Sequence, residues 1–280
     1  MRRESGIAAG GAAAAGVAGG LIGLGGAEFR LPLLLGPLRT PLREAVPLNL
    51  AVSLCVVLAA LPLRLLQASA LPEMRYVIGA VAIALGAVLA ARHGATLFAS
   101  LRSRNLAMLI RGLLFMLGAI LLAEAVFPLS PSGLLGTDAA VQLVAGVLAG
   151  IVIGLVSSLL GVAGGELIIP TLVLGFGVPV KSAGTLSILI SIPAMMVGLM
   201  RYRQLGVLRS SSMHGYFRPL ALGSIAGALV GAALVGLVPA GGLKLLLGGL
   251  LIWSAFKAIP AYEKGQVVSE QSKDTERENT

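Results

Sequence analysis

The sequence predicts an all-α polytopic membrane protein with two inverted repeats of four segments, each opening with a helical hairpin broken by glycines. Of its 280 residues, 57% are apolar and only 12% are charged, whereas a soluble domain carries about 25% charged residues. Apolar runs long enough to cross a bilayer recur along the chain. The sequence between Gly16 and Ser53 also returns, without a gap, between Gly154 and Ser191. A soluble globular fold is therefore excluded.

The repeat is clearest in a glycine-rich motif of ten residues. The segment GLGGAEFRLP at 23–32 aligns with GVAGGELIIP at 161–170. Equivalent residues, meaning those that this ungapped alignment pairs, include Gly23 and Gly161, Gly26 and Gly164, Glu28 and Glu166, Pro32 and Pro170, Asn49 and Ser187, and Ser53 and Ser191. Internal repeats of this kind are the plan of many secondary transporters.

Eight apolar segments lie between charged or Pro/Gly-rich breaks, four in each half. They span residues 5–38, 44–63, 76–91, 106–127, 139–175, 182–200, 217–237 and 243–259. The first and fifth exceed the roughly 20 residues of a single crossing, and glycines interrupt both, so we expect each to fold back. The predicted organisation is a cytoplasmic N-terminus at 1–4, repeats at 5–127 and 139–260, an extracytoplasmic linker at 128–138 and a disordered cytoplasmic tail at 261–280.

The distribution of basic residues predicts the orientation. Lys and Arg gather at both termini and in the connections at 39–43, 92–111 and 201–218, whereas the linker at 128–138 has none. Basic connections favour the cytoplasm, which leaves Arg64, Arg75, Lys181 and Lys244 outside. This assignment requires that segments one and five make no net crossing, so that the halves are inverted. If both were simple spans, the repeats would be parallel; we favour inversion.

The glycine breaks are candidate ion sites. A break at membrane depth leaves backbone groups without intrahelical partners, which is tolerated only inside protein or beside a hydrated cavity. The helix end after the break suits an anion, so we expect Gly25, Gly26, Gly164 and Gly165 to form part of a substrate site near the midplane. The alternative is that these glycines only permit close helix packing.

Three charged residues lie inside the repeated motif. Glu28 and Glu166 are the candidates for proton coupling, because an ionisable group at membrane depth is costly and usually functional. Arg30 has no charged counterpart, since its equivalent is Ile168. We expect Arg30 to neutralise a nearby carboxylate or to reach the interface, and the alternative is that it attracts an anionic substrate.

Polar residues recur in the segment after each break. Asn49 and Ser53 share one helical face, as do Ser187 and Ser191, and Thr185 aligns with Pro47. These five side chains are candidates for binding substrate oxygens. Interhelical hydrogen bonds explain them equally well.

Several function classes are disfavoured by what the sequence lacks. It has no P-loop, dinucleotide-binding or hydrolase motif, so we expect no enzyme, no catalytic residue and no cofactor. The lone Cys55 and two loop histidines, His93 and His214, predict no metal site. The net charge of +9 comes from single residues at span ends rather than a basic run with interleaved aromatics, so no nucleic-acid partner is expected.

The doubled motif resembles the TauE/SafE family of membrane permeases, also called sulfite exporter proteins. The resemblance is carried by GLGGAEFRLP with AVPLNLAVS and by GVAGGELIIP with AGTLSILIS, and it covers about residues 5–260. The second copy fits closely, whereas the first departs from the family pattern at Ala27, Arg30 and Pro47.

The resemblance implies a secondary transporter for small sulfur-containing anions, such as sulfite or sulfoacetate. It implies a bacterial inner membrane and, commonly, export; proton coupling through Glu28 or Glu166 would fit. A passive anion channel with the same fold is the alternative. The expected partners are the anion, membrane lipid and, as an alternative to a monomer, a second copy of the chain.

Overall fold

In the computed structural model, the described part of the chain consists of helices joined by short connections. It comprises residues 2–35, 37–38, 40, 42–67, 72–100, 138–206 and 211–235, with scattered positions at 112–136 and 237–256. No strand occurs among these residues. Five of the described helices are long and apolar enough to cross a membrane, at Arg43–Leu65, Met74–Leu97, Ala139–Leu159, Val180–Gln204 and Gly215–Leu234. The predicted all-α class with several membrane spans is confirmed.

The described helices of the first half are α1, α2, α3 and α4. They span Arg2–Ile22, Ala27–Leu35, Leu42–Leu65 and Val77–Ser100, with a short 3-10 turn at Met74–Tyr76 before α4. The third predicted segment, 76–91, is therefore longer than expected, and His93 lies within α4 rather than in a connection. Most of the predicted segment at 106–127 lies outside the described residues.

The second half has the same order of elements. It contains α6 at Ala139–Leu160, α7 at Gly165–Pro170 with a π-helical turn at Thr171–Gly175, α8 at Val180–Gln204 and α9 at Ser211–Leu234. The α1 and α6 helices end at equivalent residues of the repeat, and α3 and α8 begin at equivalent residues. The repeat in sequence is thus a repeat in helix boundaries. The predicted segment at 243–259 and the tail lie almost wholly outside the described residues.

Glycine ends the first helix of each half. Gly23 follows α1 with a φ of +96°, and Gly161 follows α6 with a φ of +64°. L-residues with a β-carbon rarely adopt such values, so the α-helix stops there and the chain turns. The helix breaks predicted from the glycine motif are therefore present in both halves.

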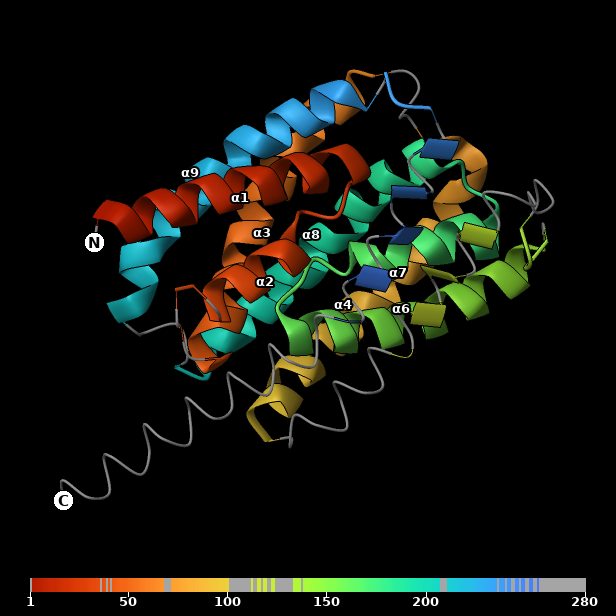
Figure 1. Cartoon of the computed structure of the whole chain (residues 1–280). Helices are drawn as coiled ribbons and strands as arrows, with labels where there is room; N and C mark the ends of the chain where they lie inside the picture. The colour runs from red at the N-terminus through yellow and green to blue at the C-terminus, as the bar shows by residue number, and fades with distance from the viewer. Residues whose placement is uncertain are drawn as a thin grey trace.

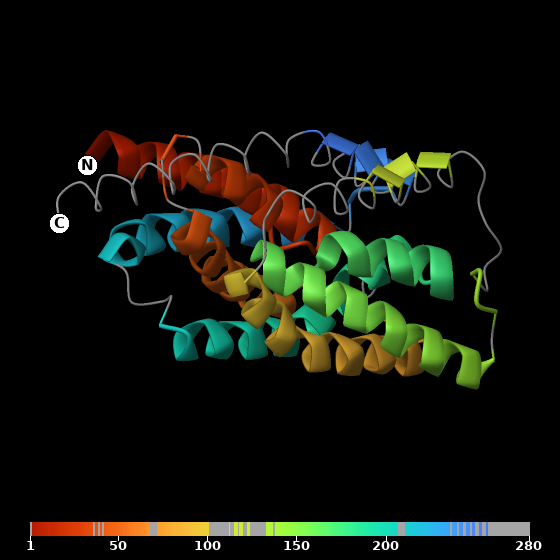
Figure 2. The same cartoon turned by 90° about the horizontal axis from the view of Figure 1, so that it is seen from below.

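The two halves interlock rather than standing side by side. Helix α1 packs along α9, and α4 packs along α6, so the first helix of each half lies against the last described helix of the other (Figure 1). Helices α3 and α8 contact each other and also these outer pairs. In both views α1 and α9 run in one direction along the bundle, whereas α4 and α6 run in the other (Figure 2).

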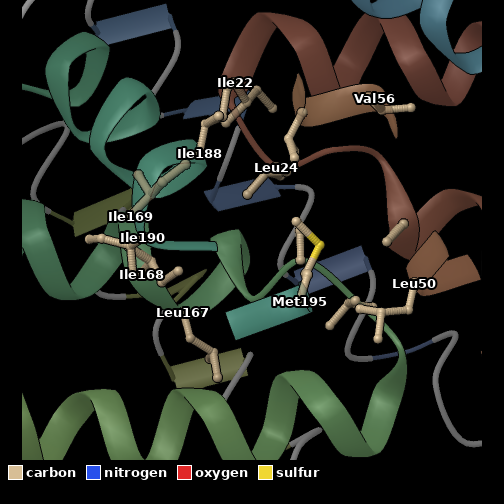
Figure 3. Close-up of a cluster of buried hydrophobic side chains, with 14 of the residues drawn as sticks. Ile22, Leu24, Leu50, Val56, Leu167, Ile168, Ile169, Ile188, Ile190 and Met195 are labelled. Carbon is tan, nitrogen blue, oxygen red and sulfur yellow. The ribbon is translucent and has the colours of Figure 1, made fainter. Parts of the chain in front are cut away.

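The centre of the bundle is apolar and is built from both halves. Figure 3 shows Ile22, Leu24 and Leu50 from the first half with Ile168, Ile188 and other side chains from the second. Ile22, Leu24 and Ile168 are each 1% exposed. Polar side chains buried in this region are therefore surrounded by apolar groups that cannot form hydrogen bonds with them.

Candidate functional site

The two glycine turns meet at the centre of the protein. A β-carbon built on Gly25 would lie 3.5 Å from the β-carbon of Ala163, its equivalent in the second half. Each turn also packs on the opposite half: a β-carbon on Gly23 would overlap the Gly184 carbonyl, and one on Gly161 would overlap the Val46 carbonyl. Gly184 and Val46 are themselves equivalent residues of the repeat, so these contacts are reciprocal. The tertiary structure thus brings both halves of the predicted site together.

In the first half, Arg30 organises a buried polar network. Its side chain is fully buried, and its Nε donates a hydrogen bond of 3.2 Å to Asn49 Oδ1. Its Nη1 donates to the Gly25 carbonyl at 2.8 Å and to Ser224 Oγ at 3.2 Å, and its Nη2 donates to Ser53 Oγ at 2.5 Å. Arg30 therefore links α2, α3 and α9, and the expectation that it reaches the interface is wrong.

The other members of this network are also bonded to the backbone. Asn49 Nδ2 donates to the Ala27 carbonyl at 2.9 Å, and Ser53 Oγ donates to the Asn49 carbonyl at 2.7 Å. Both side chains are fully buried. Three of the predicted substrate-binding residues, Arg30, Asn49 and Ser53, therefore lie together but bind one another.

In the second half, the residues equivalent to Asn49 and Ser53 are Ser187 and Ser191, and their hydroxyls are buried without such partners. Ser187 is 0% exposed and Ser191 is 1% exposed, and neither Oγ has a hydrogen-bond partner among the described residues. Leaving a buried polar group unsatisfied costs about 1–3 kcal/mol. Two such groups one helical turn apart are a reason to look for a ligand.

Gly165 lies directly beside this pair. A β-carbon at Gly165 would come within 2.9 Å of Ser187 Oγ and 3.0 Å of Leu24 Cα. Gly165 is the first residue of α7, and Gly164 precedes it as the N-cap. Gly165 thus brings backbone close to the Ser187 hydroxyl, whereas a side chain at 165 would press against it.

Thr185 and the two glutamates are placed differently from the serine pair. The Thr185 hydroxyl is also buried without a partner among the described residues. At about 100° per residue, however, it lies on roughly the opposite side of α8 from Ser187. Glu166 is in the first turn of α7 and is 4% exposed. Glu28 is in α2, and its side chain lies outside the described part of the structure.

One pair of residues was missed by the sequence analysis. Arg64 in α3 is fully buried, and its Nη2 donates to the carbonyls of Gly20 at 2.9 Å and Leu21 at 2.6 Å. In the second half, fully buried Tyr202 donates through its hydroxyl to the Ser158 carbonyl. The last four carbonyls of a helix lack intrahelical partners, so each side chain satisfies the end of a broken helix.

The repeat itself could have identified this pair. Arg64 and Tyr202 are equivalent when the same ungapped alignment is extended beyond Ser53, and Gly20 and Ser158 are equivalent within it. The extension places a long polar side chain opposite the break in both halves. The apolar pattern ends the second predicted segment at residue 63 and so places Arg64 in the connection that follows it; the structure instead places Arg64 in the last turn of α3, where it is buried.

The described residues contain no group of three or more His, Cys, Asp or Glu that could hold a metal ion. The site therefore consists of hydroxyl, amide and backbone groups, with Arg30 and Glu166 as its ionisable side chains in the described region. Hydroxyl, amide and backbone groups of this kind can form hydrogen bonds with a small polar solute.

Comparison with known proteins agrees with the architecture. Residues 146–278 match the family model described as Sulfite exporter TauE/SafE. No curated protein and no solved structure was found to match the chain. The matched region contains the second glycine turn, Gly165, Ser187 and Ser191, and the divergent first copy of the motif lies outside it. Over residues 146–278 the chain is therefore similar to the TauE/SafE family of sulfite exporter membrane permeases.

Proposed function

We propose that the protein is a secondary transporter that moves a small sulfur oxyanion, sulfite or an organosulfonate such as sulfoacetate, out across the bacterial inner membrane. The single observation that carries this proposal is the pair of buried hydroxyls at Ser187 and Ser191, which have no hydrogen-bond partner among the described residues. The match to a permease family supports the reaction class.

The chemistry of the serine pair suits such an anion. Sulfite and sulfonates carry three oxygens that share negative charge. The hydroxyls of Ser187 and Ser191 can each donate one hydrogen bond to one of these oxygens. A hydrogen bond to a charged group contributes about 1.5–3 kcal/mol, compared with about 1 kcal/mol for a neutral pair. Binding would therefore recover the free energy lost by burying the two hydroxyls unsatisfied.

Glu166 supports proton coupling. It is 4% exposed and follows Gly165 directly, so its carboxyl group belongs to the same turn that approaches Ser187. An ionisable side chain inside a membrane protein is costly and usually functional, so Glu166 is our candidate for the proton carrier. Glu28, its equivalent in the first half, has the same proposed role.

An inverted arrangement of the halves supports alternating access to the central site. The opposite directions of α1 and α6, which occupy equivalent places in the two halves, favour inversion over parallel repeats (Figures 1 and 2). Repeats related in this way can exchange conformations, so that the site opens first to one side and then to the other.

Counterflow in proteoliposomes tests the proposed function. Vesicles loaded with unlabelled sulfite, sulfoacetate or taurine should take up the same labelled anion, with and without an imposed proton gradient. The double variant Ser187→Ala/Ser191→Ala should lose this exchange. Thr171→Val is the matched control, because the Thr171 hydroxyl already donates to the Leu167 carbonyl within its own helix at 2.7 Å.

Proton coupling has a separate readout. Glu166→Gln should remove the response of exchange to the proton gradient, and an unchanged response would take Glu166 out of the mechanism. Anion leak without counterflow would identify a channel instead of a carrier. Absence of flux for all three anions would overturn the proposed substrate class.

A further inference from the structure

The two halves of the site differ in size at equivalent positions. Three equivalent pairs surround the polar centre, and in each pair the first half has the larger side chain. The pairs are Ala27 and Gly165, Arg30 and Ile168, and Asn49 and Ser187. The fourth position is serine in both halves, Ser53 and Ser191. At all three positions, therefore, the second half has the smaller side chain.

Arg30 fills the polar centre of the first half. At least four of the five N–H donors of its guanidinium group are used on protein acceptors. Asn49 donates in turn to the carbonyl of Ala27, the position that is glycine in the second half. A second anion would have to displace bonds that the protein already makes with its own atoms.

The second half has the equivalent positions of the repeat but no arginine at the position of Arg30. Ile168 replaces the guanidinium with an aliphatic side chain that cannot donate a hydrogen bond, and it is 1% exposed. Ser187 and Ser191 keep their hydroxyls, which have no partner among the described residues. Gly165 leaves the space beside Ser187 Oγ free of a β-carbon.

We propose that the protein binds one anion per chain, at Ser187 and Ser191 of the second half, and that Arg30 is a built-in occupant of the equivalent position in the first half. This inference rests on the proposed function and adds to it the stoichiometry and the location of the site. The first half then takes part in transport without being a second binding site.

The same substitution at two equivalent positions tests the inference. Purified protein in nanodiscs would be titrated with labelled sulfite and, separately, with labelled sulfoacetate, and its thermal midpoint would be measured without anion. Ser191→Ala should weaken anion binding about tenfold or more, because it removes a hydrogen bond to a charged group. Its thermal midpoint without anion should not fall and should rise slightly, because the substitution removes a buried hydroxyl that has no partner among the described residues.

Ser53→Ala should behave in the opposite way. It removes a hydroxyl that accepts from Arg30 and donates to Asn49, so its thermal midpoint should fall while its affinity for the anion stays within about twofold of wild type. Equal weakening of binding by Ser53→Ala and Ser191→Ala would overturn the inference. Saturation at two anions per chain would also overturn it.

An arginine introduced at position 168, the equivalent of Arg30, gives a second, independent test. Ile168→Arg introduces into the second half the donor that Arg30 provides in the first, so it should abolish anion binding by occupying Ser187 and Ser191. Ile168→Met is the matched control, with a long side chain but without donors, and should retain binding. If Ile168→Arg does not fold, the serine pair of variants decides the question.

The outcomes separate the two levels of the proposal. Wild-type protein that binds neither probe would overturn the proposed function, and the single-site inference would fall with it. Wild-type protein that binds a probe and exchanges it, but with two sites or with a site sensitive to Ser53→Ala, would overturn the single-site inference alone.

Discussion

The hydrogen bond from Tyr202 to the Ser158 carbonyl can be removed by a single substitution. Tyr202→Phe deletes the hydroxyl and keeps the ring, which is fully buried between α8 and α6. The Ser158 carbonyl lies in the last turn of α6, where the helix provides no partner. The substitution therefore leaves a buried acceptor unsatisfied next to the second glycine turn.

The expected loss of stability follows from that geometry. Stranding a buried acceptor costs about 1–3 kcal/mol in soluble proteins, and hydrogen bonds in membrane proteins average about 0.6 kcal/mol with a maximum near 1.7. We therefore expect Tyr202→Phe to lower the free energy of unfolding by about 1–2 kcal/mol. At about 2–4 °C per kcal/mol for a chain of this size, the thermal midpoint should fall by about 2–8 °C.

The lone cysteine provides the assay. Cys55 lies in α3 and is partly buried, so a fluorogenic maleimide should react with it faster as the bundle unfolds. Tyr216→Phe is the control, because Tyr216 is partly buried on α9 and its hydroxyl has no hydrogen bond to another described residue. If Tyr202→Phe shifts the midpoint no more than Tyr216→Phe does, the capping role assigned to Tyr202 is wrong.

Two further predictions concern topology and the glycine turns. Leu66 and Gln204 are exposed, equivalent positions at which single cysteines can be introduced in a Cys55→Ala background. If the halves are inverted, the two cysteines should react with an impermeant maleimide from opposite sides of the membrane. Labelling of both from the same side would establish parallel repeats. Gly161→Ala should abolish folding or transport, because the added β-carbon would meet the Val46 carbonyl at a position with positive φ. Gly206→Ala has a φ of +74° but open space, so it should lower the free energy of unfolding by only about 1 kcal/mol. Similar losses in both variants would show that the close packing of the turns does not matter.

The sequence by itself determined the class, the repeat and the places where the helices break. These features depend on local chemistry: apolar runs favour membrane helices, and clustered glycines tolerate the positive φ values found at Gly23 and Gly161. The constant offset between the two copies predicted which side chains are equivalent, and it did so without any knowledge of their contacts. The second copy of the motif was also the part that fitted the family pattern closely, and the family match lies there.

The tertiary structure decided what the polar side chains do. Sequence reasoning left open whether Asn49 and Ser53 bind substrate or form interhelical hydrogen bonds, and it gave substrate attraction as the alternative for Arg30. In the structure Arg30 bonds both of the others and also Ser224, which is far away in the sequence. A hydrogen bond between such distant residues depends on how the helices pack, and no local pattern reports it. The burial of Arg64 was missed for the same reason, because its partners are the carbonyls at the end of a different helix. The packing of the helices therefore decides that Arg30 occupies the polar centre of the first half, because only packing determines which donors reach which acceptors.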